Sequence, residues 1–124
     1  KQSGEFDFAT SNELWRATLE TLDFLPLTTA DYGGGIIITD WYNNSDNSNE
    51  SLKISIRFLT NEIRSDAIAV KIFKKDCSVI ESCKVSSIEN NLNTEIKLAI
   101  LKKATLFKKN ISTEPYKFND GNNK

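Results

Sequence analysis

The stretch SLKISIRFL, residues 51–59, alternates apolar with polar side chains along its length. Successive side chains of an extended chain point to opposite faces, so the apolar members share one face: Leu52, Ile54, Ile56 and Phe58. The other face carries Lys53, Ser55 and Arg57. Such alternation is typical of an antiparallel strand with one face on a core and one in water.

Three neighbouring segments also have strand character. They are residues 36–42 (IIITDWY), 67–75 (AIAVKIFKK) and, more weakly, 78–85 (SVIESCKV). Their β-branched and aromatic side chains favour strands. The connections between the segments are short or polar and hold no crossover helix, which favours hairpins over parallel pairing. We therefore predict about four antiparallel strands.

Helical patterns flank these strands. In residues 11–25 the apolar side chains fall on one arc, with Ser11 or Asn12 as the N-cap. Pro26 disfavours helical geometry in the residue before it, so we expect the helix to stop there and a short extended piece to follow. A second helix is expected over residues 93–109. Each helix has one apolar stripe and the sheet has one apolar face, which predicts an α+β two-layer sandwich with both helices on one face of the sheet.

The chain length of 124 residues suits one domain with one core. We expect this domain to occupy residues 13–111, between a flexible N-terminal segment, residues 1–12, and a frayed tail, residues 112–124. The chain has no methionine and starts with a short polar stretch, which indicates the mature part of a longer precursor. No apolar run approaches the ~20 residues that a membrane helix needs.

Composition argues against several classes of function. The 16 basic and 17 acidic residues give a net charge of −1, which does not suit a concentrated nucleic-acid footprint. The absence of histidine removes the commonest general base and the commonest transition-metal ligand. Two cysteines without histidine fall short of a closed zinc site. We therefore expect a non-enzymatic protein with no catalytic residue, no cofactor and no metal site.

Three successive glycines, Gly33, Gly34 and Gly35, precede the segment 36–42. A phosphate-binding loop leads into a helix, whose free N–H groups hold the anion, whereas these glycines lead into a strand. We interpret them as a structural turn that needs positive φ angles or a close approach of backbone.

The strand after this turn carries large apolar groups on both faces. Simple alternation places Asp40 and Tyr42 on one face, and Thr39 and Trp41 on the other. We predict one of the two rings in the core and the other at the surface. Two interpretations stay open for Asp40, Trp41 and Tyr42: a recognition rim for a partner molecule, or packing at the core and sheet edge.

The second helix departs from a simple amphipathic pattern at three positions. Lys103 falls inside the apolar arc, and Leu98 and Leu101 fall on the polar one. Either the stem of Lys103 packs on the core while its ammonium reaches water, or the ammonium points inward as the polar anchor of a ligand cavity. Leu98 and Leu101 either widen the buried stripe or form a small exposed patch for self-association.

The segments LWRATLETL and GGGIIITDWY are the most specific parts of a resemblance that covers residues 13–108. They resemble an uncharacterised alphaproteobacterial domain-of-unknown-function family of small exported, lipoprotein-like proteins. A weaker similarity is to the helix-grip domains of the C lipoprotein of the β-barrel assembly machinery, in which an antiparallel sheet packs on helices. The resemblance implies a helix-grip-like fold in the periplasm, or anchored to the outer membrane, of a Gram-negative bacterium. Membrane contact is then expected only through a missing N-terminal anchor.

The two cysteines, Cys77 and Cys83, are not part of the family pattern. Export would place them in an oxidising compartment, where pairing is expected if geometry allows. Six residues apart on one extended strand, however, their Cα atoms would be ~20 Å apart, far beyond the reach of a disulfide. A disulfide therefore requires residues 77–83 to bend back, in competition with the strand at 78–85. Both alternatives stay open, and the expected bond has a structural role without redox activity.

These observations leave three functions, of which an enzyme ranks last. The first is a non-enzymatic envelope protein that binds another protein as an interaction or assembly-accessory module. Its contact would be an exposed sheet edge, the rim at residues 40–42, or Leu98 and Leu101. The alternative is a carrier of a small apolar ligand, which requires an enclosed cavity of ~300 Å³ or more between sheet and helix, with Lys103 inside it.

Overall fold

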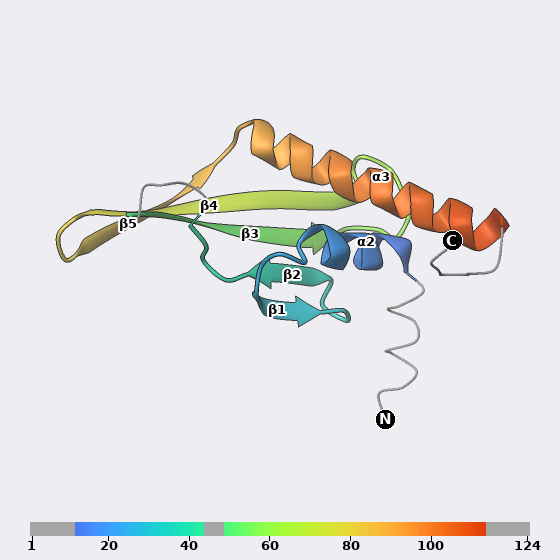
Figure 1. Ribbon diagram of the computed structural model, residues 1–124, viewed down its shortest axis with the longest axis horizontal. Coiled ribbons are helices and arrows are strands. Elements are labelled where there is room, and N and C mark those ends of the chain that lie inside the picture. The colour runs from blue at the N-terminus through green and yellow to red at the C-terminus, as the bar shows by residue number, and fades with distance from the viewer. Residues whose placement is uncertain (1–11, 44–48, 114–124) are drawn as a thin grey trace, which may run out of the picture.

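The computed structural model describes residues 12–43 and 49–113. Within these ranges the chain forms, in order, α2 (Glu13–Thr21), β1 (Leu27–Asp31), β2 (Ile36–Thr39), β3 (Glu50–Phe58), β4 (Ile68–Val79), β5 (Ser82–Ile88) and α3 (Asn91–Thr113), as Figure 1 shows. The predicted flexible segment and frayed tail lie outside the described residues, except for Asn12 and the last two residues of α3.

The strands form one antiparallel meander in the order β1-β2-β3-β4-β5. The predicted α+β class with an antiparallel sheet is confirmed, but the sheet has five strands and the prediction of about four is wrong. The extended piece after Pro26 pairs with β2 as β1. The predicted strand at 78–85 is divided by a turn, because β4 continues to Val79 and β5 starts at Ser82.

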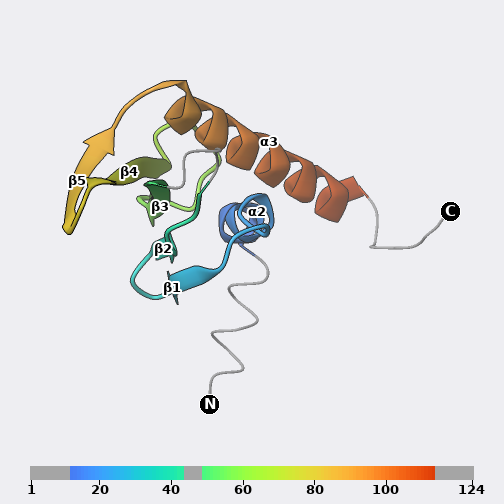
Figure 2. The same cartoon turned by 60° about the vertical axis from the view of Figure 1, so that its left-hand side comes forward.

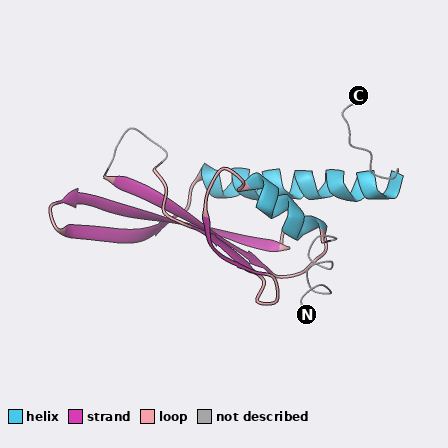
Figure 3. Cartoon of the chain, turned by 60° about the horizontal axis from the view of Figure 1, so that its bottom comes forward, coloured by secondary structure: helices cyan, strands magenta, loops and turns pink. Residues whose placement is uncertain are grey.

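Both helices lie on the same side of the sheet, as Figure 2 shows. The core between the two layers contains the apolar stripe of α2, the inner face of β2, β3 and β4, and two residues of α3, Ile100 and Ala104. The alternation in residues 51–59 determines which face is inside: Leu52, Ile54 and Ile56 are buried. Figure 3 shows that the sheet extends beyond the helices at one end, where the β4–β5 hairpin projects.

The first helix starts as predicted and ends early. The Asn12 side chain accepts the Trp15 N–H at 3.0 Å and thereby caps the helix. The helix ends at Thr21, several residues before Pro26, because the chain turns back at Leu22, whose carbonyl accepts the Leu25 N–H. This turn keeps both leucines in the core, although Leu25 is no longer helical.

The second helix is longer than predicted, because it runs from Asn91 to Thr113. Two asparagine side chains cap its start. The Asn90 Oδ1 accepts the N–H of Leu92, and the Asn93 Oδ1 accepts the N–H of Asn90. The Asn93 amide also donates to the carbonyl of Val70 at 3.2 Å. These bonds attach the start of α3 to β4.

Candidate functional site

Four positive side chains lie on the face of the sheet that the helices leave bare. In β3, Lys53 and Arg57 alternate with the buried residues, and in β4 Lys71 and Lys75 belong to the same outer face through the pairs Ser55↔Lys71 and Ser51↔Lys75. In the order Arg57, Lys71, Lys53 and Lys75, each side chain is a diagonal cross-strand neighbour of the next, at about 7–8 Å. These four residues are called the cationic band below.

None of the four forms an ion pair with another described residue. The ion pairs of residues 12–43 and 49–113 join Arg64 to Glu62 and Asp66, Lys74 to Glu50, and Lys103 to Glu20. The cationic band therefore concentrates positive charge in a protein whose net charge is −1. Charges of like sign at such spacing repel one another and attract an anionic partner.

Trp41 lies against one end of the band. The ammonium of Lys53 is 4.9 Å from the centre of its ring, and that of Lys75 is 4.6 Å away. Both distances suit cation–π attraction. The half-buried indole thus attracts two ammonium groups and offsets part of the repulsion between them.

A β-bulge decides that Trp41 faces outward. Ile38 pairs with Ser55 in the β2–β3 ladder, whereas Tyr42 pairs with Leu52, so three residues, 39–41, oppose two of β3. The Thr39 hydroxyl fills the gap in the ladder, because it accepts the N–H of Ile54 at 3.0 Å and donates to the carbonyl of Asp40 at 2.9 Å. The extra residue reverses the alternation beyond Thr39.

The bulge corrects the predicted assignment of faces. Trp41 does not share the face of Thr39, which is buried in the core, and Tyr42 packs against the core with its ring edge-on to Phe24 at 6.1 Å. Burial raises the pKa of Tyr42. The structure thus places the two rings on opposite faces, each half-buried, so Asp40, Trp41 and Tyr42 do not form one continuous rim. The Asp40 carboxylate accepts the N–H of Trp41 at 2.8 Å.

The three glycines form the turn between β1 and β2. Gly35 has φ +69°, and a Cβ on Gly34 would collide with the carboxylate of Asp31, which accepts the Gly34 N–H at 2.9 Å. Gly33 has neither restriction. Backbone conformation therefore requires glycine at Gly35, whereas a side chain at position 34 would displace the exposed carboxylate of Asp31.

An open cleft of about 340 Å³ lies between this turn, the start of α2 and the end of β3. Trp15, Tyr32 and Phe58 line it, with the ring centres of Tyr32 and Phe58 at 5.0 and 5.5 Å from that of Trp15. Its polar groups come from Asn12 and residues 60–61, and no charged side chain lines it. The cleft is open to solvent, whereas the predicted carrier cavity would be enclosed.

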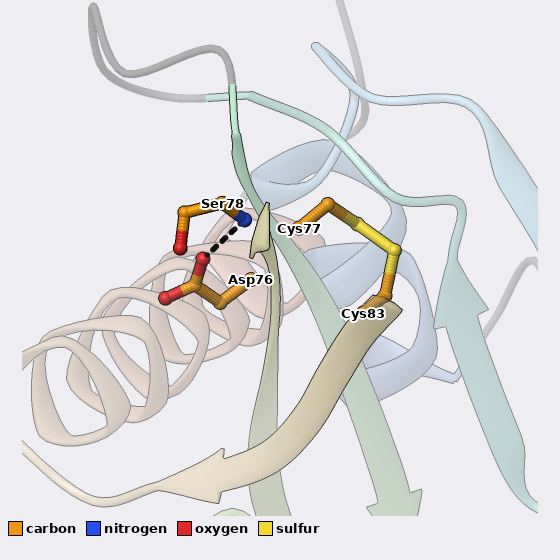
Figure 4. Close-up of a disulfide and its surroundings, with 4 residues drawn as sticks. All are labelled: Asp76, Cys77, Ser78 and Cys83. Carbon is orange, nitrogen blue, oxygen red and sulfur yellow. Dashed lines mark hydrogen bonds between the residues drawn. A yellow bond between two sulfur atoms is a disulfide. The ribbon is translucent and has the colours of Figure 1, made fainter. Parts of the chain in front are cut away.

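The β4–β5 hairpin contains both cysteines. Cys77 and Cys83 are joined by a disulfide with Cα atoms 4.1 Å apart (Figure 4). The sequence left open whether this segment forms a strand or a disulfide-closed loop. Both are present, because the chain turns at Ile80 and Glu81, between the cysteines. Glu81 takes φ 63°, which only a few non-glycine residues adopt.

Two further features distinguish the end of this hairpin. Hydrogen bonds from Ser78, first from its side chain and then from its backbone N–H at 2.9 Å, lower the pKa of Asp76. At the turn itself, Val79 and Ile80 are 66% and 84% exposed. The disulfide thus holds an apolar tip in water.

The unusual positions of α3 have separate environments. Leu98 is 58% exposed, whereas Leu101 packs against the core, so the predicted exposed pair is reduced to a single residue. The ammonium of Lys103 lies 3.7 Å from the carboxylate of Glu20 and does not enter a cavity. The interpretation with the stem on the protein and the charge in solvent therefore fits Lys103.

The described residues contain no group of three or more possible metal ligands. Among these residues, no helix is long and apolar enough to cross a membrane. The cationic band, Trp41, the hairpin tip and the edge strand β5 are considered below as binding surfaces. Sequence reasoning missed the band, although its lysines and arginine recur four residues apart within each of two strands.

The model of a family described as Domain of unknown function (DUF3576) matches residues 8–109. The chain belongs to the DUF3576 family. It is 41% identical over 93 residues to the uncharacterized protein RP420 of Rickettsia prowazekii (strain Madrid E), an alignment that covers 73% of this chain and 54% of RP420. The chain thus spans about half the length of that relative. Membership in an alphaproteobacterial DUF3576 family confirms this part of the predicted resemblance.

Proposed function

We propose that the protein is a non-enzymatic interaction module of the bacterial cell envelope that binds a partner protein by strand addition at β5. The observation that carries this proposal is the open edge of the sheet. β5 is the last strand in the sheet order, and six of its seven residues are exposed. An edge strand presents unpaired N–H and C=O groups that an extended segment of another chain can join.

The edge lacks the usual devices that prevent such pairing. β5 contains no proline and one charged side chain, Lys84, and Val85 is exposed on it. The opposite edge strand, β1, is shorter and has a register shift between Leu27 and Thr29. The β4–β5 ladder also has a register shift, between Asp76 and Val79, so the advantage of β5 for a partner strand is its greater length.

Chemistry and compartment also support the proposal. The chain has no histidine, and the aromatic cleft brings together no pair of carboxylates or nucleophile with a base. A disulfide in the hairpin suits an oxidising compartment such as the periplasm. A carrier is less well supported, because buried Ile54, Ile72 and Ile100 fill the space between the layers.

Site-specific photo-cross-linking in the native bacterium tests the proposal. A photoreactive residue at Ser86 or Ser87 samples the two faces of β5, and one at the exposed Thr105 of α3 serves as the matched control. We expect both β5 positions, and not Thr105, to yield adducts with the same protein. Adducts of equal yield from Thr105, or none from β5, would contradict strand addition.

A further inference from the structure

The cationic band leads along β4 to the apolar tip of the hairpin. From Lys71 the outer face passes through Lys75 to Cys77, and the strand then ends at Val79, beside the turn residue Ile80. Trp41 lies beside Lys75 at the same end of the band. Figures 1 and 3 show this end projecting past both helices. Four positive charges and an indole thus share the outer face, and the same hairpin ends in the exposed turn residue Ile80, whereas the register with Ser82 places Val79 on the other face.

None of the described carboxylates forms an ion pair with the four side chains of the band. Alternation places one carboxylate among the outward residues of the strands, that of Asp31, and it lies on β1, two strands from the band. Asp31 already accepts the Gly34 N–H. Asp76 falls on the opposite face of β4, in register with Glu50. A negatively charged partner would therefore complement the outer face.

The indole and the tip distinguish among anionic partners. Bases of single-stranded nucleic acid need a free aromatic ring on which to stack, whereas the ring of Trp41 is occupied by Lys53 and Lys75. A soluble acidic polymer would satisfy the cations and leave Val79 and Ile80 in water. A bilayer with anionic headgroups offers negative charge to the lysines and the arginine and an apolar interior to the hairpin tip.

We infer that the cationic band and the hairpin tip dock the protein onto an anionic lipid bilayer. The band contacts the headgroups, and the side chain of Ile80, at the turn of the hairpin, enters the boundary of the acyl region. Glu81, next to Ile80 in the turn, keeps this insertion shallow, because a carboxylate is costly to remove from water. This contact is separate from β5 strand addition and adds to any N-terminal anchor.

Vesicle flotation with the 124-residue chain tests the inference without any protein partner. The probes are phosphatidylcholine vesicles with about 30% phosphatidylglycerol, and vesicles of phosphatidylcholine alone. We expect binding only to the anionic vesicles, and a loss of binding as salt rises from about 50 mM to about 500 mM.

Charge variants locate the contact. Each basic residue near an anionic surface changes the partition coefficient about fivefold, so Lys53→Gln with Lys75→Gln should weaken binding about 30-fold. Arg57→Gln with Lys71→Gln should do the same while it leaves the Trp41 contacts intact. The matched control, Lys102→Gln with Lys108→Gln, removes two exposed charges from α3 and should change binding less than about twofold.

The tip is tested by Ile80→Ser, which should weaken binding to anionic vesicles about fivefold through the loss of partly buried apolar surface. An unchanged affinity of this variant would overturn the insertion of the tip. Absence of binding to the anionic vesicles, or an equal loss in the α3 control, would also overturn the inference.

Discussion

Replacement of Thr39 by valine should break the bulge that turns Trp41 outward. Valine has nearly the shape of threonine, so the variant removes a hydroxyl from a fully buried side chain without making a cavity. The N–H of Ile54 then loses its acceptor in the core, and the carbonyl of Asp40 loses its donor. The variant therefore changes hydrogen bonding and leaves the packing in place.

The expected cost follows from these two groups. A buried N–H left without a partner costs about 1–3 kcal/mol, and the Asp40 carbonyl, on an exposed residue, regains a bond from water. We therefore expect Thr39→Val to lower the free energy of unfolding by about 1–3 kcal/mol. Thr39→Ser keeps the hydroxyl and loses one methyl group, so it should cost about 1 kcal/mol.

Urea unfolding followed by far-UV circular dichroism measures these differences. Thr28→Val on β1 is the matched control, because the exposed Thr28 hydroxyl donates to the carbonyl of Ile38 at 3.3 Å and its loss should cost less than about 0.5 kcal/mol. If Thr39→Val proved as stable as Thr39→Ser, the hydroxyl would not hold the bulge, and this account of the orientation of Trp41 would be wrong.

Four other outcomes are expected. Gly35→Ala should lower the free energy of unfolding in urea by about 1–2 kcal/mol because Gly35 has φ +69°, whereas Gly33→Ala should change it by less than about 0.5 kcal/mol. Equal effects would show that the positive φ of Gly35 is not the cause. In an NMR titration the pKa of Asp76 should lie below its ordinary value of about 3.9 and rise in Ser78→Ala. Because the folded pKa is the lower one, the ionised carboxylate stabilises the hairpin above the unfolded pKa, and this contribution disappears as pH falls through the folded pKa. Protection factors of the hairpin amides that do not fall at acid pH would contradict this expectation. Reduction of the disulfide should add ~2 Da to the intact mass and accelerate amide exchange in β5 first, and an unchanged mass would exclude the bond. Sedimentation of the unmodified protein and of Leu98→Lys tests self-association through α3. A dimer that dissociates in the variant would support self-association, and a monomer in both proteins would contradict it.

Several features of the fold could be predicted from local patterns because their causes are local. Alternation in residues 51–59 identified the buried face of β3, and helical spacing identified α2 and α3. The end of α2 was mispredicted because Pro26 limits only how far a helix can extend, and the Leu22–Leu25 turn ends it earlier. The turn of the β4–β5 hairpin has neither glycine nor asparagine, so nothing in its residues distinguished two strands from one.

The candidate binding surface could not be predicted from local sequence patterns. Alternation assigns Lys53 and Lys71 to the outer face, but a slip of two residues between β3 and β4 leaves every side chain on its own face and changes all its neighbours. The pairing of Lys53 with Phe73 is therefore a property of the closed hairpin, and it brings residues 53, 57, 71 and 75 into one band. The face of Trp41 depends likewise on the bond between Thr39 and Ile54, which are 15 residues apart. The sequence by itself determined which side chains of the regular strands face water. Only the tertiary structure decided which of them are neighbours, and on which face Trp41 lies, because register and bulge are set by contacts between distant residues.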